Sequence, residues 1–198
     1  MKKLSIFLFS GVLVALSWSC NSGEPSSTEA AKDSNATKMA DTTSSANTMA
    51  STVSKADQNF AVDAANAGMT EVQAGQMAEQ QGMEKSVKDY GKMMVRDHTE
   101  AADKLKSIAT TKNITLPSSV SPEMQKNLDD LRSKSGKDFD KAYLDMMVSD
   151  HKKVISAFED EAKNGSDADI RAFADSTLHT LHHHLDEAEK CSKMMKKM

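Results

Sequence analysis

The sequence is poor in aromatic residues, proline and glycine. Its 198 residues include one Trp, two Tyr, six Phe, three Pro and eight Gly. No stretch alternates polar and apolar residues in the way that a strand with one buried face does. With so few aromatics, the core must be filled by aliphatic side chains and by the 14 methionines, which suits closely packed helices. An all-α fold is therefore predicted.

Basic residues are scarce as well. The chain has 25 Lys and Arg against 29 Asp and Glu, a net charge of -4. No basic stripe exists that could neutralise phosphates, so we expect no nucleic-acid partner. The sequence also lacks a set of nucleophile, base and orienting residue, a phosphate loop or a cofactor fingerprint, and these absences argue against most enzyme classes.

The first residues have the form of an export signal. Lys2 and Lys3 precede an apolar run that ends at Leu16, which is shorter than the roughly 20 residues of a membrane-spanning helix. Cys20 follows a small residue, as in the cleavage site of a bacterial lipoprotein. We therefore expect residues 1–19 to be removed and Cys20 to carry lipid, with the membrane a partner through that anchor. An ordinary secretory signal with an incidental cysteine is the alternative.

The segment after the signal has little to bury. Residues 20–53 are dominated by Ser, Thr, Ala and Asn and contain no aromatic residue, so burial cannot offset their ordering entropy. They are predicted to form a flexible tether between the lipid and a single domain over residues 54–198. If Cys20 carries lipid, Cys191 is the only other cysteine and no intramolecular disulfide can form.

A hexad near the middle of the chain is written twice. Residues 93–98 read Met-Met-Val-Arg-Asp-His, and residues 146–151 repeat them with one letter changed. Residues four apart share a face of a helix, so Met94 stacks on His98 and Met147 on His151. Asp97 and Asp150 fall one step to the side. The repeat indicates a metal site built from two helices, or else an old duplication of a helix hairpin whose histidines only pack.

Helical periodicity covers most of the predicted domain. Long amphipathic segments occupy residues 54–82, 84–111, 138–163 and 167 onward, with a short helix at 123–134 before the third long one. Each long segment carries one polar residue on its inward stripe, and these are Glu71, His98, His151 and His184. The other histidines of the last segment, at positions 179, 182 and 183, are predicted to face solvent. The pattern predicts an antiparallel, up-down four-helix bundle around a central site.

Several short motifs resemble a known family in their order and spacing. They are Phe60 to Ala65, Glu71-Val72-x-x-Gly75-x-x-Ala78, Met94-Val95-x-Asp97-His98, Leu116-Pro117, Phe139-Asp140-x-x-Tyr143 and His184-Leu185-x-x-Ala188. Over about residues 57–190 the sequence is similar to the bacterial domain-of-unknown-function family numbered 4142. That resemblance implies a ferritin-like bundle and a cell-envelope location, outer-membrane or periplasmic, and leaves the chemistry open. Leu178-His179 departs from the Leu-Pro that the family usually has before its last histidine.

The candidate metal ligands favour soft or borderline ions. Ferritin-like di-iron sites use two Glu-x-x-His motifs, which this sequence lacks, so iron is disfavoured. Imidazole and thioether suit copper or zinc, and a distant likeness to His- and Met-rich copper-binding envelope proteins points the same way by analogy. We expect metal buffering or stress defence, with a structural or partner-binding protein and a ferroxidase as the alternatives; any protein partner is unknown. The candidate site comprises Glu71, Met94, Asp97, His98, Met147, Asp150, His151 and His184.

Overall fold

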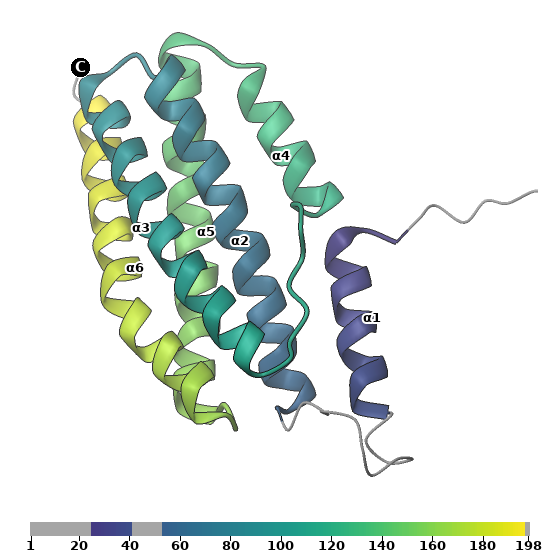
Figure 1. The fold of residues 1–198 in the computed structure, drawn as a ribbon. Helices are drawn as coiled ribbons and strands as arrows, with labels where there is room; N and C mark the ends of the chain where they lie inside the picture. The colour runs from purple at the N-terminus through teal and green to yellow at the C-terminus, as the bar shows by residue number, and fades with distance from the viewer. Residues whose placement is uncertain (1–24, 41–52, 197–198) are drawn as a thin grey trace, which may run out of the picture.

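The computed structural model describes residues 25–40 and 53–196, and these residues form four long helices and two short ones. Figure 1 shows their arrangement. The long helices are α2 (Lys55–Gln81), α3 (Lys85–Thr111), α5 (Gly136–Asn164) and α6 (Ala168–Met195). The short helices are α1 (Ser27–Ala40) and α4 (Pro122–Arg132). The described residues contain no strand. The predicted all-α bundle with an extra short helix before the third long one is confirmed, and the predicted helix bounds differ from the observed ones by only a few residues.

The long helices are joined as two antiparallel hairpins, α2 with α3 and α5 with α6. Helix α2 also packs against α5, and α3 against α6, so α2 and α6 occupy opposite corners. The segment after α3 returns along the bundle through α4, and α5 therefore starts at the same end as α3 (Figure 1). The predicted simple up-down order, with each helix beside the next, is thus wrong. Because of this long crossover, α3 and α5 run in the same direction and lie diagonally across the bundle from each other.

Carboxylates from one hairpin cap the turn of the other. Asp140, at the start of α5, accepts hydrogen bonds from the backbone N–H groups of Met83 and Glu84, both at 2.8 Å. Asp57, at the start of α2, accepts from the N–H of Asp167 at 2.7 Å and from that of Ser166. Both carboxylates are buried. These bonds satisfy backbone donors that a helix start leaves unpaired and hold the two hairpins in register.

Two glycines let α2 and α3 approach closely. A Cβ atom on Gly91 would lie 2.7 Å from the backbone oxygen of Gly75, and one on Gly75 would lie 2.9 Å from that of Gly91. Neither backbone can retreat without separating the helices. Residues without a side chain are therefore needed at both positions for this close contact.

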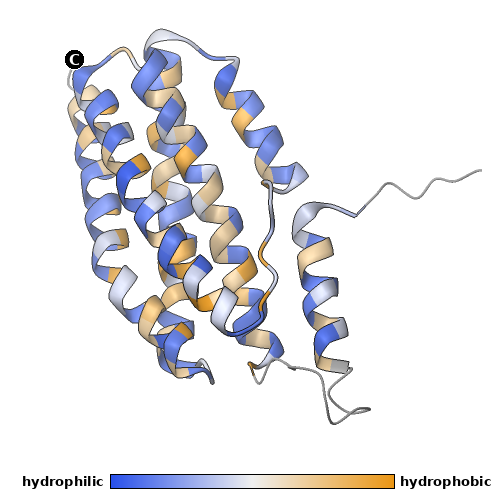
Figure 2. Cartoon of the chain, viewed as in Figure 1, coloured by the Kyte–Doolittle hydropathy of each residue, from blue (hydrophilic) through white to orange (hydrophobic). Residues whose placement is uncertain are grey.

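The buried apolar residues form two clusters, one toward each end of the bundle. One cluster includes Tyr90, Met94, Tyr143 and Met147 near the starts of α3 and α5. The other includes Leu105 and aromatic residues near the opposite end. Figure 2 shows polar and apolar residues interspersed along all four long helices, as the sequence periodicity indicates. The candidate site lies between the two clusters.

Helix α1 corrects the prediction of a flexible tether for residues 27–40. Residues 27–40 are helical and pack on α2, and Ala31 and Asn35 are each 2% exposed. Asn35 donates to the backbone oxygen of Thr115 at 2.9 Å and accepts from its N–H at 2.7 Å, while Lys32 pairs with Asp63 at 2.7 Å. The prediction counted large apolar side chains, whereas this helix is attached chiefly by polar contacts.

Part of the N-terminal prediction lies outside the described residues, namely the signal over residues 1–19, the lipidated Cys20 and the tether over residues 21–24 and 41–52. Within the described part of the chain, none of the helices combines the length and apolar character needed to cross a membrane.

Candidate metal centre

Three buried histidines come together at one level of the bundle. His98 on α3, His151 on α5 and His184 on α6 are 7%, 0% and 0% exposed. One ligand atom from each ring lies within 4.8 Å of the others. Glu71, from α2, lies beside two of the rings, so each long helix places one polar side chain at this level. A cluster of this kind is able to hold a metal ion.

The hydrogen bonds of His151 and His184 fix which nitrogen of each ring carries a proton. His151 Nδ1 lies 3.0 Å from the backbone oxygen of Met147, and a carbonyl can only accept, so Nδ1 is the protonated nitrogen. His184 Nε2 lies 2.9 Å from Asp97 Oδ2, and an ionised carboxylate also only accepts. The remaining nitrogens, His151 Nε2 and His184 Nδ1, face each other at 3.3 Å. Two lone pairs therefore point at one another unless a cation lies between them.

His98 and Glu71 complete the cluster. Glu71 Oε2 lies 3.3 Å from His98 Nδ1, and its Oε1 lies 3.4 Å from His151 Nδ1. The carboxylate thus stands beside the Nδ1 atoms of two rings. His98 Nε2 and Glu71 Oε1 are buried without a hydrogen-bond partner. The described residues therefore leave His98 Nε2 free to bind a further group.

Burial keeps the three imidazoles neutral. It lowers the pKa of His151 to about 4, with a further contribution from the neighbouring His184. It also lowers the pKa of His98 well below the usual range, and that of His184 although Asp97 opposes the change. Neutral imidazole is the form that binds a metal. Burial, followed by the negative charge of Asp150, raises the pKa of Glu71 to about 8.

The two aspartates of the repeated hexad have different surroundings. Asp97 accepts from His184 at 2.9 Å and from two nitrogens of Arg96 at 2.6 Å and 3.1 Å. Burial alone would raise the pKa of Asp97, but the hydrogen bonds from Arg96 and His184 outweigh it and lower the pKa. Asp150 is half-buried, and its ion pair is with Lys153 at 3.7 Å. Asp97 therefore orients a histidine, whereas Asp150 stands outside the cluster on the far side of Glu71.

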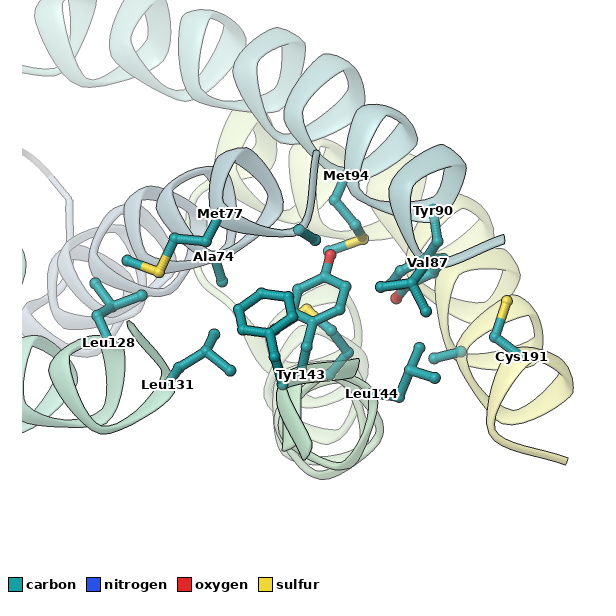
Figure 3. Close-up of a cluster of buried hydrophobic side chains, with 14 of the residues drawn as sticks. Ala74, Met77, Val87, Tyr90, Met94, Leu128, Leu131, Tyr143, Leu144 and Cys191 are labelled. Carbon is teal, nitrogen blue, oxygen red and sulfur yellow. The ribbon is translucent and has the colours of Figure 1, made fainter. Parts of the chain in front are cut away.

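The paired methionines lie one helical turn from the histidines. Met94 and Met147 are both fully buried, in the apolar cluster that also contains Tyr90 and Tyr143 (Figure 3). They cover the histidine level on the side where α3 and α5 begin. Met147 contributes in addition its backbone oxygen, which accepts from His151.

The level on the opposite side of the histidines is hollow. A pocket there is lined by small and apolar residues from all four long helices, together with Glu71 and His98. The small residues of α2 have two different surroundings. Gly75 meets the backbone of α3, whereas an added Cβ at Gly68 would meet nothing within 4 Å.

Some features of the centre were not foreseen in the sequence. Arg96, which clamps Asp97, lies next to it in the repeat, at the one position where the two copies differ. Small residues such as Ala67, Gly68 and Ala101 line the hollow. The sequence shows that these residues are small, but not how each helix is rotated and therefore which of them face the same space. His179, His182 and His183 are exposed, as predicted for these positions.

Comparison with known proteins supports the fold and gives no activity. The family described as "Domain of unknown function (DUF4142)" matches residues 40–191. A DUF305 fragment from Deinococcus radiodurans, known from its crystal structure, superimposes with a TM-score of 0.64 at 8% sequence identity, covering 74% of this chain and 99% of that chain. At that identity the likeness concerns the fold alone. No curated protein matches the sequence.

Proposed function

This chain belongs to the DUF4142 family, and we propose that it binds one transition-metal ion, copper or zinc, through His98, His151 and His184. The observation that carries the proposal is the pair of opposed lone pairs on His151 Nε2 and His184 Nδ1, 3.3 Å apart. Two nitrogens bound to a tetrahedral ion at about 2.0–2.1 Å lie roughly 3.4 Å apart. Only His98 would need to move inward.

The surroundings of the rings support a metal better than a packing role. In metal sites, the ring nitrogen that does not bind the ion donates to a carboxylate or backbone carbonyl. Met147 O supports His151, Asp97 supports His184, and Glu71 lies 3.3 Å from His98 Nδ1. In this arrangement Glu71 and Asp97 contact the ring nitrogens that do not bind the ion, and they are not ligands themselves. Asp150 lies farther from the ion than either.

The donor set selects among metals. Three imidazoles suit zinc and copper, and thioethers at one turn's distance add a preference for Cu(I) if Met94 or Met147 swings inward. A di-iron centre needs several carboxylates that bridge the two ions. The carboxylates of Glu71 and Asp97 lie beside ring nitrogens instead, so the site does not suit a di-iron centre. We therefore propose buffering of copper or zinc, or defence against an excess of either. In this proposal the protein is held at a membrane of the cell envelope by lipid on Cys20.

Metal titration of purified protein tests the site. Wild type is expected to bind one equivalent of Cu(I) or Zn²⁺, measured by competition with a chromophoric chelator. Loss of one of three ligands should weaken binding by at least about a hundredfold, beyond the 10–100-fold typical of an outer residue, so His98→Ala and His151→Ala should each lose stoichiometric binding.

His183→Ala, on the exposed face of α6, is the matched control and should bind like wild type. If the His98→Ala/His151→Ala double variant binds copper and zinc as tightly as wild type, the proposal is wrong. The histidines would then serve to hold the helices in register by hydrogen bonds.

A further inference from the structure

The metal centre is covered differently on its two sides. Toward the starts of α3 and α5, Met94 and Met147 are fully buried and close over the histidines. Toward the other end, the next residues inward are small or recessed, among them Gly68, Ala101 and Thr177. The space there that a water-sized molecule can occupy is about 30 Å³.

Three histidine ligands leave a tetrahedral ion with one open position. Zinc sites that bind exogenous ligands have this composition, three protein ligands and one exchangeable position. Glu71 is the polar side chain best placed to close the position, but its oxygens lie beside the Nδ1 atoms of His98 and His151. The ion would bind His151 Nε2 and His184 Nδ1, the nitrogens that face each other. In each ring the other nitrogen, His151 Nδ1 or His184 Nε2, points away from the ion and makes a hydrogen bond. Glu71 therefore does not occupy the fourth position in this arrangement.

The hollow reaches the histidine cluster at His98. His98 and Glu71 form part of its wall, and His98 Nε2 and Glu71 Oε1 are the buried polar atoms there without a hydrogen-bond partner. We infer that a small uncharged molecule, such as a diatomic gas or one water, reaches the fourth coordination position of the ion through this hollow. The inference rests on the proposed metal binding and adds the class of ligand.

The lining explains the choice of ligand. No Lys or Arg is among the residues that line the hollow, and most of them are Ala, Leu, Val or Phe. An anion passing through such surroundings would lose its hydration without gaining a cationic side chain from the lining. A neutral molecule loses little, and a space of about 30 Å³ suits a molecule the size of water or of a diatomic gas.

Carbon monoxide on the Cu(I)-loaded protein is the probe. Wild type, loaded with one equivalent of Cu(I) without oxygen, should show an infrared band of copper-bound CO. Gly68→Phe and Ala101→Leu place bulk in the hollow and should weaken CO binding at least tenfold while copper binding stays stoichiometric. Gly68→Ala adds one methyl group into free space and should retain CO binding.

Met94→Leu tests whether the fourth ligand comes from the methionine side of the centre or from the hollow. If a methionine fills the fourth position, wild type should give no CO band and Met94→Leu or Met147→Leu should give one, which would overturn the inference. Unchanged CO binding in both Gly68→Phe and Ala101→Leu would overturn it as well. Bound copper with no CO band in any variant refutes the inference alone, whereas failure to bind copper or zinc refutes the proposed function with it.

Discussion

At the scale of single residues, the two aspartates of the repeated hexad allow a matched test. Asp97 accepts from His184 at 2.9 Å, whereas Asp150 pairs with Lys153. Residues that orient a ligand typically contribute 10–100-fold to metal affinity. Asp97→Ala should therefore weaken copper or zinc binding by about that factor, measured by chelator competition, and Asp150→Ala by less than about threefold. Equal losses in the two variants would contradict this division of roles.

A second residue-scale prediction concerns Glu161, at the end of the bundle away from the methionines. Burial, followed by the charges of Asp57, Asp160 and Asp167, raises the pKa of Glu161 to about 7 from its ordinary 4.5. Between these values the folded state holds a proton that the unfolded state has released, so the free energy of unfolding falls as pH rises. Stability from this group is fully present below pH 4.5.

Glu161→Gln removes that titration. It should raise the free energy of unfolding at pH 8 by on the order of 1 kcal/mol, a value reduced for solvent screening, and leave it unchanged at pH 4. Urea unfolding across this range measures the difference. Glu100→Gln, an exposed acid on α3, should shift stability by less than about 0.5 kcal/mol at every pH. A wild-type stability that does not decline from pH 4.5 to 7 relative to Glu161→Gln would contradict the prediction.

At the scale of helices, replacing two glycines of the α2–α3 hairpin by alanine should change stability in opposite directions. Gly91→Ala places a methyl group 2.7 Å from a backbone oxygen of α2, and overpacking of this kind costs about 1–3 kcal/mol. Gly68→Ala meets open space and gains helix propensity worth up to about 1 kcal/mol. Thermal or urea unfolding should show the first variant destabilised and the second equal to or above wild type. Destabilisation of both would mean that the space beside Gly68 is not available.

The helices themselves could be predicted from the sequence, and their order in space could not. Periodicity located the long helices because each buries one continuous apolar stripe. The diagonal placement of α2 and α6 depends on which way the crossover through α4 passes, which no local pattern specifies. Helix α1 was missed because it docks through Asn35 and other polar side chains, and their partners near Thr115 lie about 80 residues away.

The repeated hexad shows what sequence spacing can and cannot establish about a site. It identified His98 and His151, and the inward stripe of the last helix added His184. It suggested a hairpin duplication, but the copies lie on α3 and α5, the second helix of one hairpin and the first of the other. The different roles of Asp97 and Asp150 depend on Arg96, on Lys153 and on neighbours from other helices, and these could be placed only by the fold.

At the scale of the whole molecule, anchoring is the property to test. The proposal is that lipid on Cys20 attaches the protein to a membrane, and acyl chains are a strong hydrophobic attachment for an otherwise polar chain. Cys20→Ser should move the protein from the membrane fraction to the soluble fraction after cell lysis. Cys191→Ser, at the buried cysteine, is the control and should stay with membranes. A Cys20→Ser protein that stays with membranes as firmly as wild type would rule the anchor out.

The division into two hairpins has a consequence for how a bound ion would act. His98 belongs to the α2–α3 hairpin, while His151 and His184 belong to the α5–α6 hairpin. An ion held by all three would add a further link between two halves that are also joined by packing, by the crossed carboxylate caps and by polar contacts such as that of Asp97 with His184. Separating the halves would release the ion, and loading the ion would resist their separation. Release of the ion and separation of the two hairpins would then occur together. A partner protein or a membrane surface that separates the hairpins would therefore also release the metal.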